Sequence, residues 1–172
     1  MKALGIIMVF FASIAIILSI TFGILCYYNY SRDIGSYWNL ADKASTIPQK
    51  SKQIDIFVTR LQESNLAGGY NAIILQTPDN SFDQNFIALQ SFQGRLHEIQ
   101  GMDIKSFEYQ TAIQQITAQE QGEAKSMLDE FFGVYIKTHY FLLWNWVCYV
   151  QVILCIIIGV WGAASLVEGR GG

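Results

Sequence analysis

Two long stretches without a charged side chain constrain this sequence more than any other feature. The first runs from Leu4 to Tyr28 over 25 residues, and the second runs from Tyr140 to Val167 over 28 residues. The hydrocarbon core of a bilayer requires about 20 apolar residues of helix, whereas apolar runs in buried helices of soluble proteins seldom exceed about 14. The sequence therefore predicts two transmembrane helices, at residues 4–28 and 140–167.

The segment between the two runs has the composition of a water-exposed domain. Residues 32–137 hold nine of the eleven basic residues and thirteen of the fourteen acidic residues. We therefore expect one extramembrane domain over residues 29–139, with a short tail at 168–172 after the second span. All three cysteines lie in the apolar runs. We expect neither a disulfide framework nor a cysteine-based metal site in the domain.

The first run has the features of an uncleaved signal anchor. Lys2 precedes it, it is too long for a cleaved signal peptide, and no A-x-A cleavage site follows it. This favours both termini inside the cytoplasm and the domain outside it, in a prokaryotic plasma (inner) membrane, although the flanking Lys and Arg residues do not decide the orientation. Aromatic residues cluster on the domain side of both runs, as in an interfacial belt. The expected anchors are Tyr27, Tyr28, Trp38, Tyr140, Trp144 and Trp146.

Helical periodicity recurs through the domain. A helix start at Ser45–Pro48 precedes a stripe of four apolar residues, Ile54, Phe57, Val58 and Leu61. A second stripe runs from Phe82 to Ile99 and is stopped by Gly101. Asp103 or Ser106 is expected to cap a third helix. The segment "YNAIILQ" fits either a helical turn or a strand.

A fourth apolar stripe begins after Glu123 and runs directly into the second uncharged run. We expect this last helix to continue into the membrane without a break. The predicted fold is all-α, with two transmembrane helices forming an antiparallel hairpin that brackets an extramembrane bundle of about four helices.

Small residues recur at a spacing of seven in both spans. They are Gly5, Ala12, Ser19 and Cys26 in the first, and Cys148, Cys155 and Gly162 in the second. Small residues allow helix backbones to approach closely in lipid. If the centres of the two spans lie at equal depth, Ser19 comes level with Gln151. Ala12 then faces Ile158, and Gly5 faces Ser165.

Gln151 is the one carboxamide in the apolar core of the second span. Its place in the run puts it near the middle of the membrane, where an unpaired amide would cost several kcal/mol. We therefore predict a hydrogen bond with Ser19. A glutamine has more donors and acceptors than one serine can use, which favours a further partner on a neighbouring chain.

The sequence contains no arrangement typical of catalysis. His97 is expected at the surface and His139 at the membrane boundary, and neither has a second His or Cys at metal-ligand spacing. Gly68-Gly69 lacks the lysine of a phosphate-binding loop. A net charge of −3 and the absence of a basic patch disfavour nucleic acid. We expect no enzymatic activity, cofactor or metal site.

These observations favour a non-enzymatic structural or accessory subunit of a membrane complex. Its partners would be membrane lipid and other membrane subunits, or further copies of itself, contacted through the helical domain and the small-residue faces of the spans. One alternative is a sensory or ligand-binding domain, because the architecture resembles the periplasmic sensing modules of bacterial chemoreceptors. With only residues 168–172 after the second span, such a sensor would signal through a partner. A small oligomeric channel is the other alternative.

Overall fold

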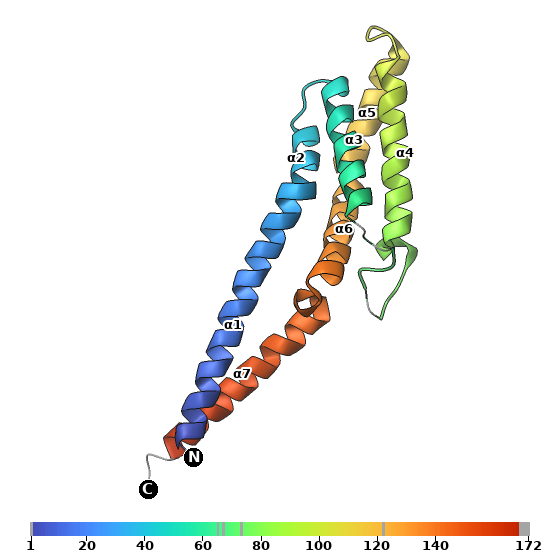
Figure 1. The fold of residues 1–172 in the computed structure, drawn as a ribbon. Coiled ribbons are helices and arrows are strands. Elements are labelled where there is room, and N and C mark those ends of the chain that lie inside the picture. The colour runs from blue at the N-terminus through green and yellow to red at the C-terminus, as the bar shows by residue number, and fades with distance from the viewer. Residues whose placement is uncertain (1, 65, 67, 73, 122, 169–172) are drawn as a thin grey trace. The chain divides into compact units, whose positions relative to one another are not determined.

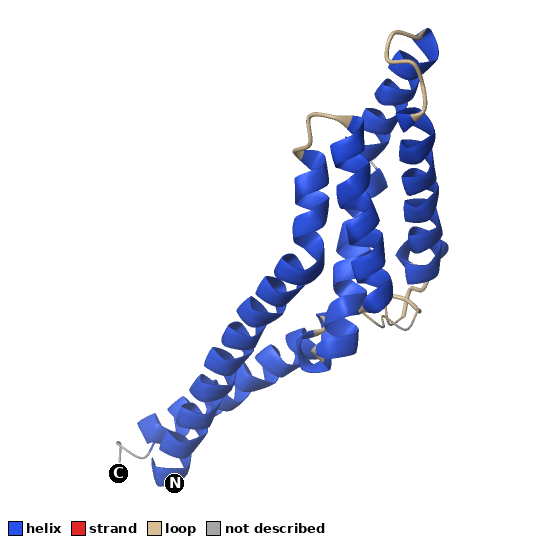
Figure 2. Cartoon of the chain, turned by 45° about the horizontal axis from the view of Figure 1, so that its top comes forward, coloured by secondary structure: helices blue, strands red, loops and turns tan. Residues whose placement is uncertain are grey.

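The computed structural model of the protein describes residues 2–64, 66, 68–72, 74–121 and 123–168. The described residues are mainly helical and include no β-strand, so the predicted all-helical class is confirmed (Figures 1 and 2). The chain divides into two compact units. We call Met1–Tyr28 with His139–Gly172 the terminal unit, and Asn29–Thr138 the central unit.

The terminal unit contains the two long apolar helices, α7 (Asn145–Glu168) and α1 (Lys2–Tyr30) up to Tyr28. The last two residues of α1 belong to the central unit. Both are long and apolar enough to cross a membrane, with mean hydropathies of 2.6 and 2.3 in their most apolar windows. Only 11% and 6% of those windows are buried within the protein. The core helix of a soluble protein would be mostly buried, whereas the apolar side chains of α1 and α7 are mostly exposed.

The expectation of one unbroken helix through the fourth stripe and the second span is wrong. Helix α6 (Glu123–His139) ends before Tyr140, whose backbone leaves the helical region at φ −139° and ψ 53°. A 3₁₀ turn, η3 (Phe141–Leu143), follows, and α7 begins only at Asn145. The turn is stabilised by a bond from the Leu143 amide to the Tyr140 carbonyl (2.7 Å) and by the Phe141 ring lying 5.8 Å from that of Trp144. Apolar periodicity does not detect such a break, because the apolar residues continue through it.

The central unit begins where the chain leaves α1 through a short π-helical segment, η1 (Ser31–Gly35), and enters α2 (Ser36–Asp42). Helix α3 (Ile47–Glu63) starts as expected, with Pro48 in its first turn and the Thr46 hydroxyl accepting a 3.4 Å bond from the amide of Gln49.

The other expected helices of the central unit are also present. Helix α4 (Phe82–Gln100) ends at Gly101 as predicted. Helix α5 (Phe107–Gln121) is capped by Ser106, whose hydroxyl accepts a 3.0 Å bond from the amide of Tyr109. Of the two proposed caps, Ser106 is therefore the one at this helix start.

The core of the central unit is built from the predicted apolar stripes. All four residues of the first stripe are buried in α3, as are Leu89, Phe92 and Leu96 in α4 and Phe131 in α6. Phe57 of α3 lies 6.3 Å from Phe131 between ring centroids. Burial of such side chains contributes about 1.5–3 kcal/mol each, which makes these contacts the main stabilisation of the unit.

The segment "YNAIILQ" is neither a helix nor a regular strand where it is described. It belongs to the connection between α3 and α4, whose ends are tied by an isolated bridge between Tyr70 and Ser81. The Phe82 amide donates to the Gly69 carbonyl (2.8 Å), and the Lys137 ammonium donates to the Tyr70 carbonyl (3.1 Å). Gly69 has a φ of +114°, a conformation that residues with a Cβ rarely adopt.

Candidate functional site

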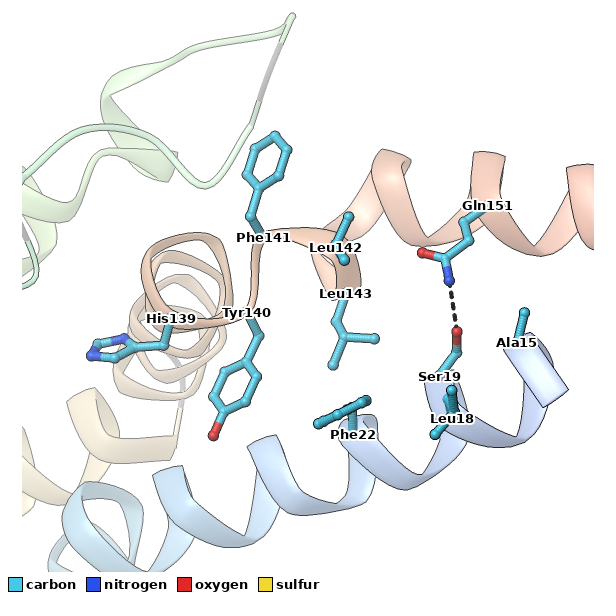
Figure 3. A pocket seen from close by; sticks show the side chains of 10 residues that line it. All are labelled: Ala15, Leu18, Ser19, Phe22, His139, Tyr140, Phe141, Leu142, Leu143 and Gln151. Carbon is cyan, nitrogen blue, oxygen red and sulfur yellow. Dashed lines mark hydrogen bonds between the residues drawn. The ribbon is translucent and has the colours of Figure 1, made fainter.

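A pocket of about 460 Å³ opens between α1, α7 and the η3 turn of the terminal unit. Helix α1 contributes Ala15, Leu18, Ser19 and Phe22 to its lining. The rest comes from residues 139–143 and from Gln151 of α7 (Figure 3). The walls are mostly aliphatic and aromatic, and the polar atoms are few.

Gln151 and Ser19 form the polar end of the pocket. The Gln151 carboxamide Nε2 donates a hydrogen bond of 2.9 Å to the Ser19 Oγ (Figure 3). Both side chains are half-buried. The hydrogen bond predicted from the sequence is confirmed.

This pair does not use all of its hydrogen-bonding capacity. Among the residues that the structure describes, neither the Gln151 Oε1 nor the second Nε2 hydrogen has a protein partner, and the Ser19 hydroxyl donates to no acceptor. Figure 3 shows the Gln151 Oε1 directed toward Leu142 and the η3 turn, on the pocket side of the helix. The pocket is therefore apolar with unused donors and an unused acceptor at one end.

The remaining small residues bring α1 and α7 together farther from the η3 turn. A Cβ atom placed on Gly162 would lie 3.0 Å from the Gly5 carbonyl oxygen and 3.1 Å from the Met8 Cβ. One placed on Gly159 would lie 3.8 Å from the Ala12 Cβ.

These contacts keep the register that Ser19 and Gln151 define. Gly159 lies against Ala12, one residue from Ile158, which was expected at that level. Gly162 lies against Met8, the residue that the same equal-depth alignment places level with it. Glycines occupy these places because close approach requires the residue without a side chain to face the neighbouring backbone.

The three cysteines are free thiols and belong to the terminal unit. Cys26 is buried at 2% exposure, and Cys148 and Cys155 are half-buried. None of them lines the pocket.

The expected interfacial aromatics have different environments. Tyr27 and Tyr28 are 64% and 57% exposed, whereas Trp144 is 6% exposed beside Phe141. Tyr140 lines the pocket, and the side chain of Trp146 lies outside the described residues.

Trp38 belongs to the central unit, not to the terminal one. Its ring lies 5.6 Å from Phe57 and 6.1 Å from Phe92 between centroids. Trp38 thus packs against aromatic residues of the core. This packing accounts for a large apolar side chain at this position, and no membrane interface is needed to explain it.

A second polar cluster, which the sequence did not reveal, joins α3 to α4. His97 Nε2 lies 2.9 Å from Asp55 Oδ1, and His97 Nδ1 lies 3.4 Å from Ser51 Oγ. Gln93 Nε2 donates to the same Asp55 oxygen at 2.7 Å. His97 lies at the surface as expected, with half of its side chain exposed, but it is paired. The only sequence signal for this cluster is the i, i+4 spacing within each helix.

Ser51, His97 and Asp55 are the residue types of a serine hydrolase triad, but their geometry does not suit nucleophilic catalysis. Ser51 is fully buried, so its hydroxyl cannot reach a substrate, and its 3.4 Å contact with the imidazole is long. The cluster instead links the two helices by polar contacts. Among the described residues, no group of three or more His, Cys, Asp or Glu side chains is placed to hold a metal ion.

Comparison of the chain with known protein families, curated proteins and solved structures finds no match.

Proposed function

We propose that this chain is a non-enzymatic, two-span membrane protein that acts as an accessory subunit of a membrane complex. In this proposal α1 and α7 form an antiparallel transmembrane hairpin. The central unit is a helical bundle outside the cytoplasm that docks onto another protein.

Contacts within the terminal unit support the hairpin. The Gln151–Ser19 bond joins the two helices at one level, and the approach of Gly162 to Gly5 joins them at another. A bond between polar side chains of two transmembrane helices contributes about 0.6–2 kcal/mol, and close packing at small residues adds to it. Most large side chains on both helices remain exposed, which suits contact with lipid.

The observation that carries the docking proposal is an exposed apolar surface where α4 passes into α5. Ile104 is 68% exposed and Phe107 is 81% exposed. A groove of about 500 Å³ lies beside them, between Ile104, Ile113 and Ile116 on one side and the start of α3 on the other. Large aromatic and aliphatic side chains grouped in this way are typical of protein interfaces.

The position of this surface within the central unit argues for a protein partner over lipid. The N-terminal end of α4 lies beside the last turns of α6, because Phe82 bonds to Gly69 and Tyr70 bonds to Lys137. Helix α6 leads into the second apolar helix. The exposed surface lies at the opposite end of α4, which has 19 residues and is therefore about 28 Å long. The length of α4 therefore separates this surface from the end of the central unit where the chain continues toward α7.

Site-specific photocrosslinking in intact membranes tests the docking surface. A photoreactive amino acid at Phe107 should give one discrete crosslinked protein, whereas the same amino acid at Gln90, an exposed polar position of α4, should give none. Phe107→Ser should abolish the complex on native gels with little change in the melting temperature, because Phe107 is outside the core. Equal crosslinking at both positions, or an unchanged complex in Phe107→Ser, would refute docking here.

Membrane placement is tested separately. Both α1 and α7 should keep the chain in the pellet after alkaline carbonate extraction. A cysteine placed at the exposed Thr59 should react with a membrane-impermeant maleimide in intact cells, because we place the central unit outside the cytoplasm. Release by carbonate would refute the two spans, and labelling only after cell lysis would refute the orientation.

A further inference from the structure

We propose that the pocket between α1 and α7 binds a membrane-soluble molecule that carries a carbonyl oxygen on an apolar chain. This inference rests on the membrane placement proposed above, but not on the docking surface of the central unit. It assigns a ligand class to a site inside the predicted spans.

The shape and walls of the pocket suit an apolar chain. Its volume of about 460 Å³ falls within the range of 300–1,000 Å³ that is usual for small-molecule sites. Leu18 and Phe22 of α1 line it together with Leu142 and Leu143, and Figure 3 shows Leu143 pointing toward Phe22.

The polar end of the pocket selects for a hydrogen-bond acceptor. In the orientation shown, the Gln151 amide gives one hydrogen to Ser19 and keeps a second, and the Ser19 hydroxyl hydrogen is also unused. If the carboxamide were rotated by 180°, Ser19 would donate to the amide oxygen and both amide hydrogens would be unused. An amide N–H donor therefore remains in either orientation. A ligand carbonyl is the simplest group that accepts from it.

The depth of the pair makes such a ligand the appropriate partner. Gln151 is six residues after Asn145, the first residue of α7, which places it about 9 Å along the helix axis. At this depth a bilayer provides no water to satisfy an amide, and an unused polar group is costly. A phospholipid head group belongs nearer the surface. A neutral acyl ester lipid and an isoprenoid quinone share the required chemistry, a carbonyl joined to a long apolar chain.

Photoaffinity labelling in lipid nanodiscs tests the proposal with three diazirine probes. One is a diacylglycerol, one is a short-tailed benzoquinone, and one is an alkane without any oxygen. We expect at least one carbonyl probe to label residues that line the pocket, such as Phe22 and Leu143, and to be displaced by its unlabelled parent compound. The two carbonyl probes distinguish the acyl ester source from the quinone source. The alkane should label both apolar helices diffusely and should not be displaced.

Two kinds of variant separate the polar anchor from the cavity. Gln151→Leu should weaken the saturable labelling about three- to eighteenfold, because a hydrogen bond between polar groups in a membrane contributes about 0.6–1.7 kcal/mol. Ala15→Phe should abolish it by filling the pocket while leaving the Gln151–Ser19 bond in place. The matched control Ala164→Phe, at an exposed position of α7 outside the pocket, should not change it.

The results distinguish three ways in which the idea fails. Labelling that no carbonyl compound displaces, or that is equal in Ala15→Phe and wild type, overturns the binding site. Loss of labelling together with crosslinks from residue 151 to another copy of the chain would show that a neighbouring protein uses the spare amide donor. Release of the protein by carbonate would instead refute the membrane placement on which both proposals rest.

Discussion

Replacing Tyr30 by phenylalanine should stabilise the central unit, although Tyr30 belongs to its core. Tyr30 is 7% exposed, and its ring lies 5.0 Å from Phe132 and 5.2 Å from Tyr135. Its hydroxyl oxygen is buried without a hydrogen-bond partner among the described residues. Tyr30→Phe keeps the ring contacts and removes only this unsatisfied group.

The magnitude follows from the cost of burying that hydroxyl. An unsatisfied buried polar group costs about 1–3 kcal/mol, and part of this is recovered when the group is deleted without changing the shape of the side chain. We therefore expect the free energy of unfolding to rise by about 1 kcal/mol. For a unit of this size, that corresponds to a rise in melting temperature of about 4 °C.

The same burial gives a pH dependence of known sign. Burial, with smaller contributions from the charge of Asp129 and from Tyr135, raises the pKa of Tyr30 well above the ordinary tyrosine value of about 10. Above pH 10 the unfolded chain loses this proton while the folded chain keeps it, so ionisation favours unfolding. The contribution of Tyr30 is therefore intact below pH 10 and declines by at most about 1.4 kcal/mol per pH unit above it. Tyr30→Phe should remove that part of the alkaline loss.

The assay is thermal unfolding of the full-length protein in detergent micelles, followed by the fluorescence of Trp38. The other three tryptophans, Trp144, Trp146 and Trp161, are replaced by phenylalanine so that only the central unit reports. Tyr109→Phe is the matched control, because Tyr109 is half-buried and its hydroxyl is not one of the buried groups without a partner, so its removal should change stability little. A loss of 1 kcal/mol or more in Tyr30→Phe would show that the hydroxyl has a partner, and would refute the reasoning.

Three further predictions use matched or simple substitutions. Gly94→Ala should stabilise the central unit by about 0.5–1 kcal/mol, because the new Cβ meets nothing within 4 Å in the middle of α4. Gly133→Ala should destabilise the unit, because its Cβ would collide with the side-chain amide of Asn71 in the α3–α4 connection. Urea unfolding of the two variants compares their signs, and equal effects would contradict the described packing. Asp55→Ala should cost about 1–2 kcal/mol in the same assay by removing the acceptor of its histidine and glutamine partners; no change would mean that these half-exposed contacts contribute nothing. Gly162→Val should weaken the α1–α7 contact by about 1–3 kcal/mol in SDS unfolding of micellar protein, while Gly23→Val, with nothing within 4 Å of its Cβ, should be neutral.

The sequence predicted helix positions well because two strong local signals coincide. Thr46 and Pro48 start α3, Gly101 ends α4, and the apolar residues between such signals repeat with the period of a helix. The bond between Gln151 and Ser19 could also be predicted, because a polar side chain within a long apolar helix has few possible partners and a high cost if it has none.

Features that depend on tertiary contacts were not visible. Trp38 follows an apolar run, as an interfacial residue would, yet it contacts Phe57 of the core, which is 19 residues farther along the chain. His97 has no ligand or acid at a recognisable spacing, and its contacts with Ser51 and Asp55 arise only when α3 packs beside α4. Periodicity describes which face of one helix is apolar, but it does not say which polar groups on two helices will meet.

The break between α6 and α7 and the pocket are one structural feature. In a continuous helix, Leu143 and Gln151 would be eight residues and about 12 Å apart, and their directions around the axis would differ by about 80°. With the extended backbone at Trp144 and the 3₁₀ turn before it, both side chains instead line the same cavity, Leu143 opposite Phe22 and Gln151 opposite Ser19. Part of the apolar wall thus comes from residues 140–143, which the apolar periodicity predicts to be part of one continuous helix. The polar end comes from Gln151, a residue that periodicity marks only as an exception. Neither the apolar run nor the single glutamine predicts a binding site by itself. The interruption of the α-helix at residues 140–144 brings the apolar walls and the polar group into one pocket.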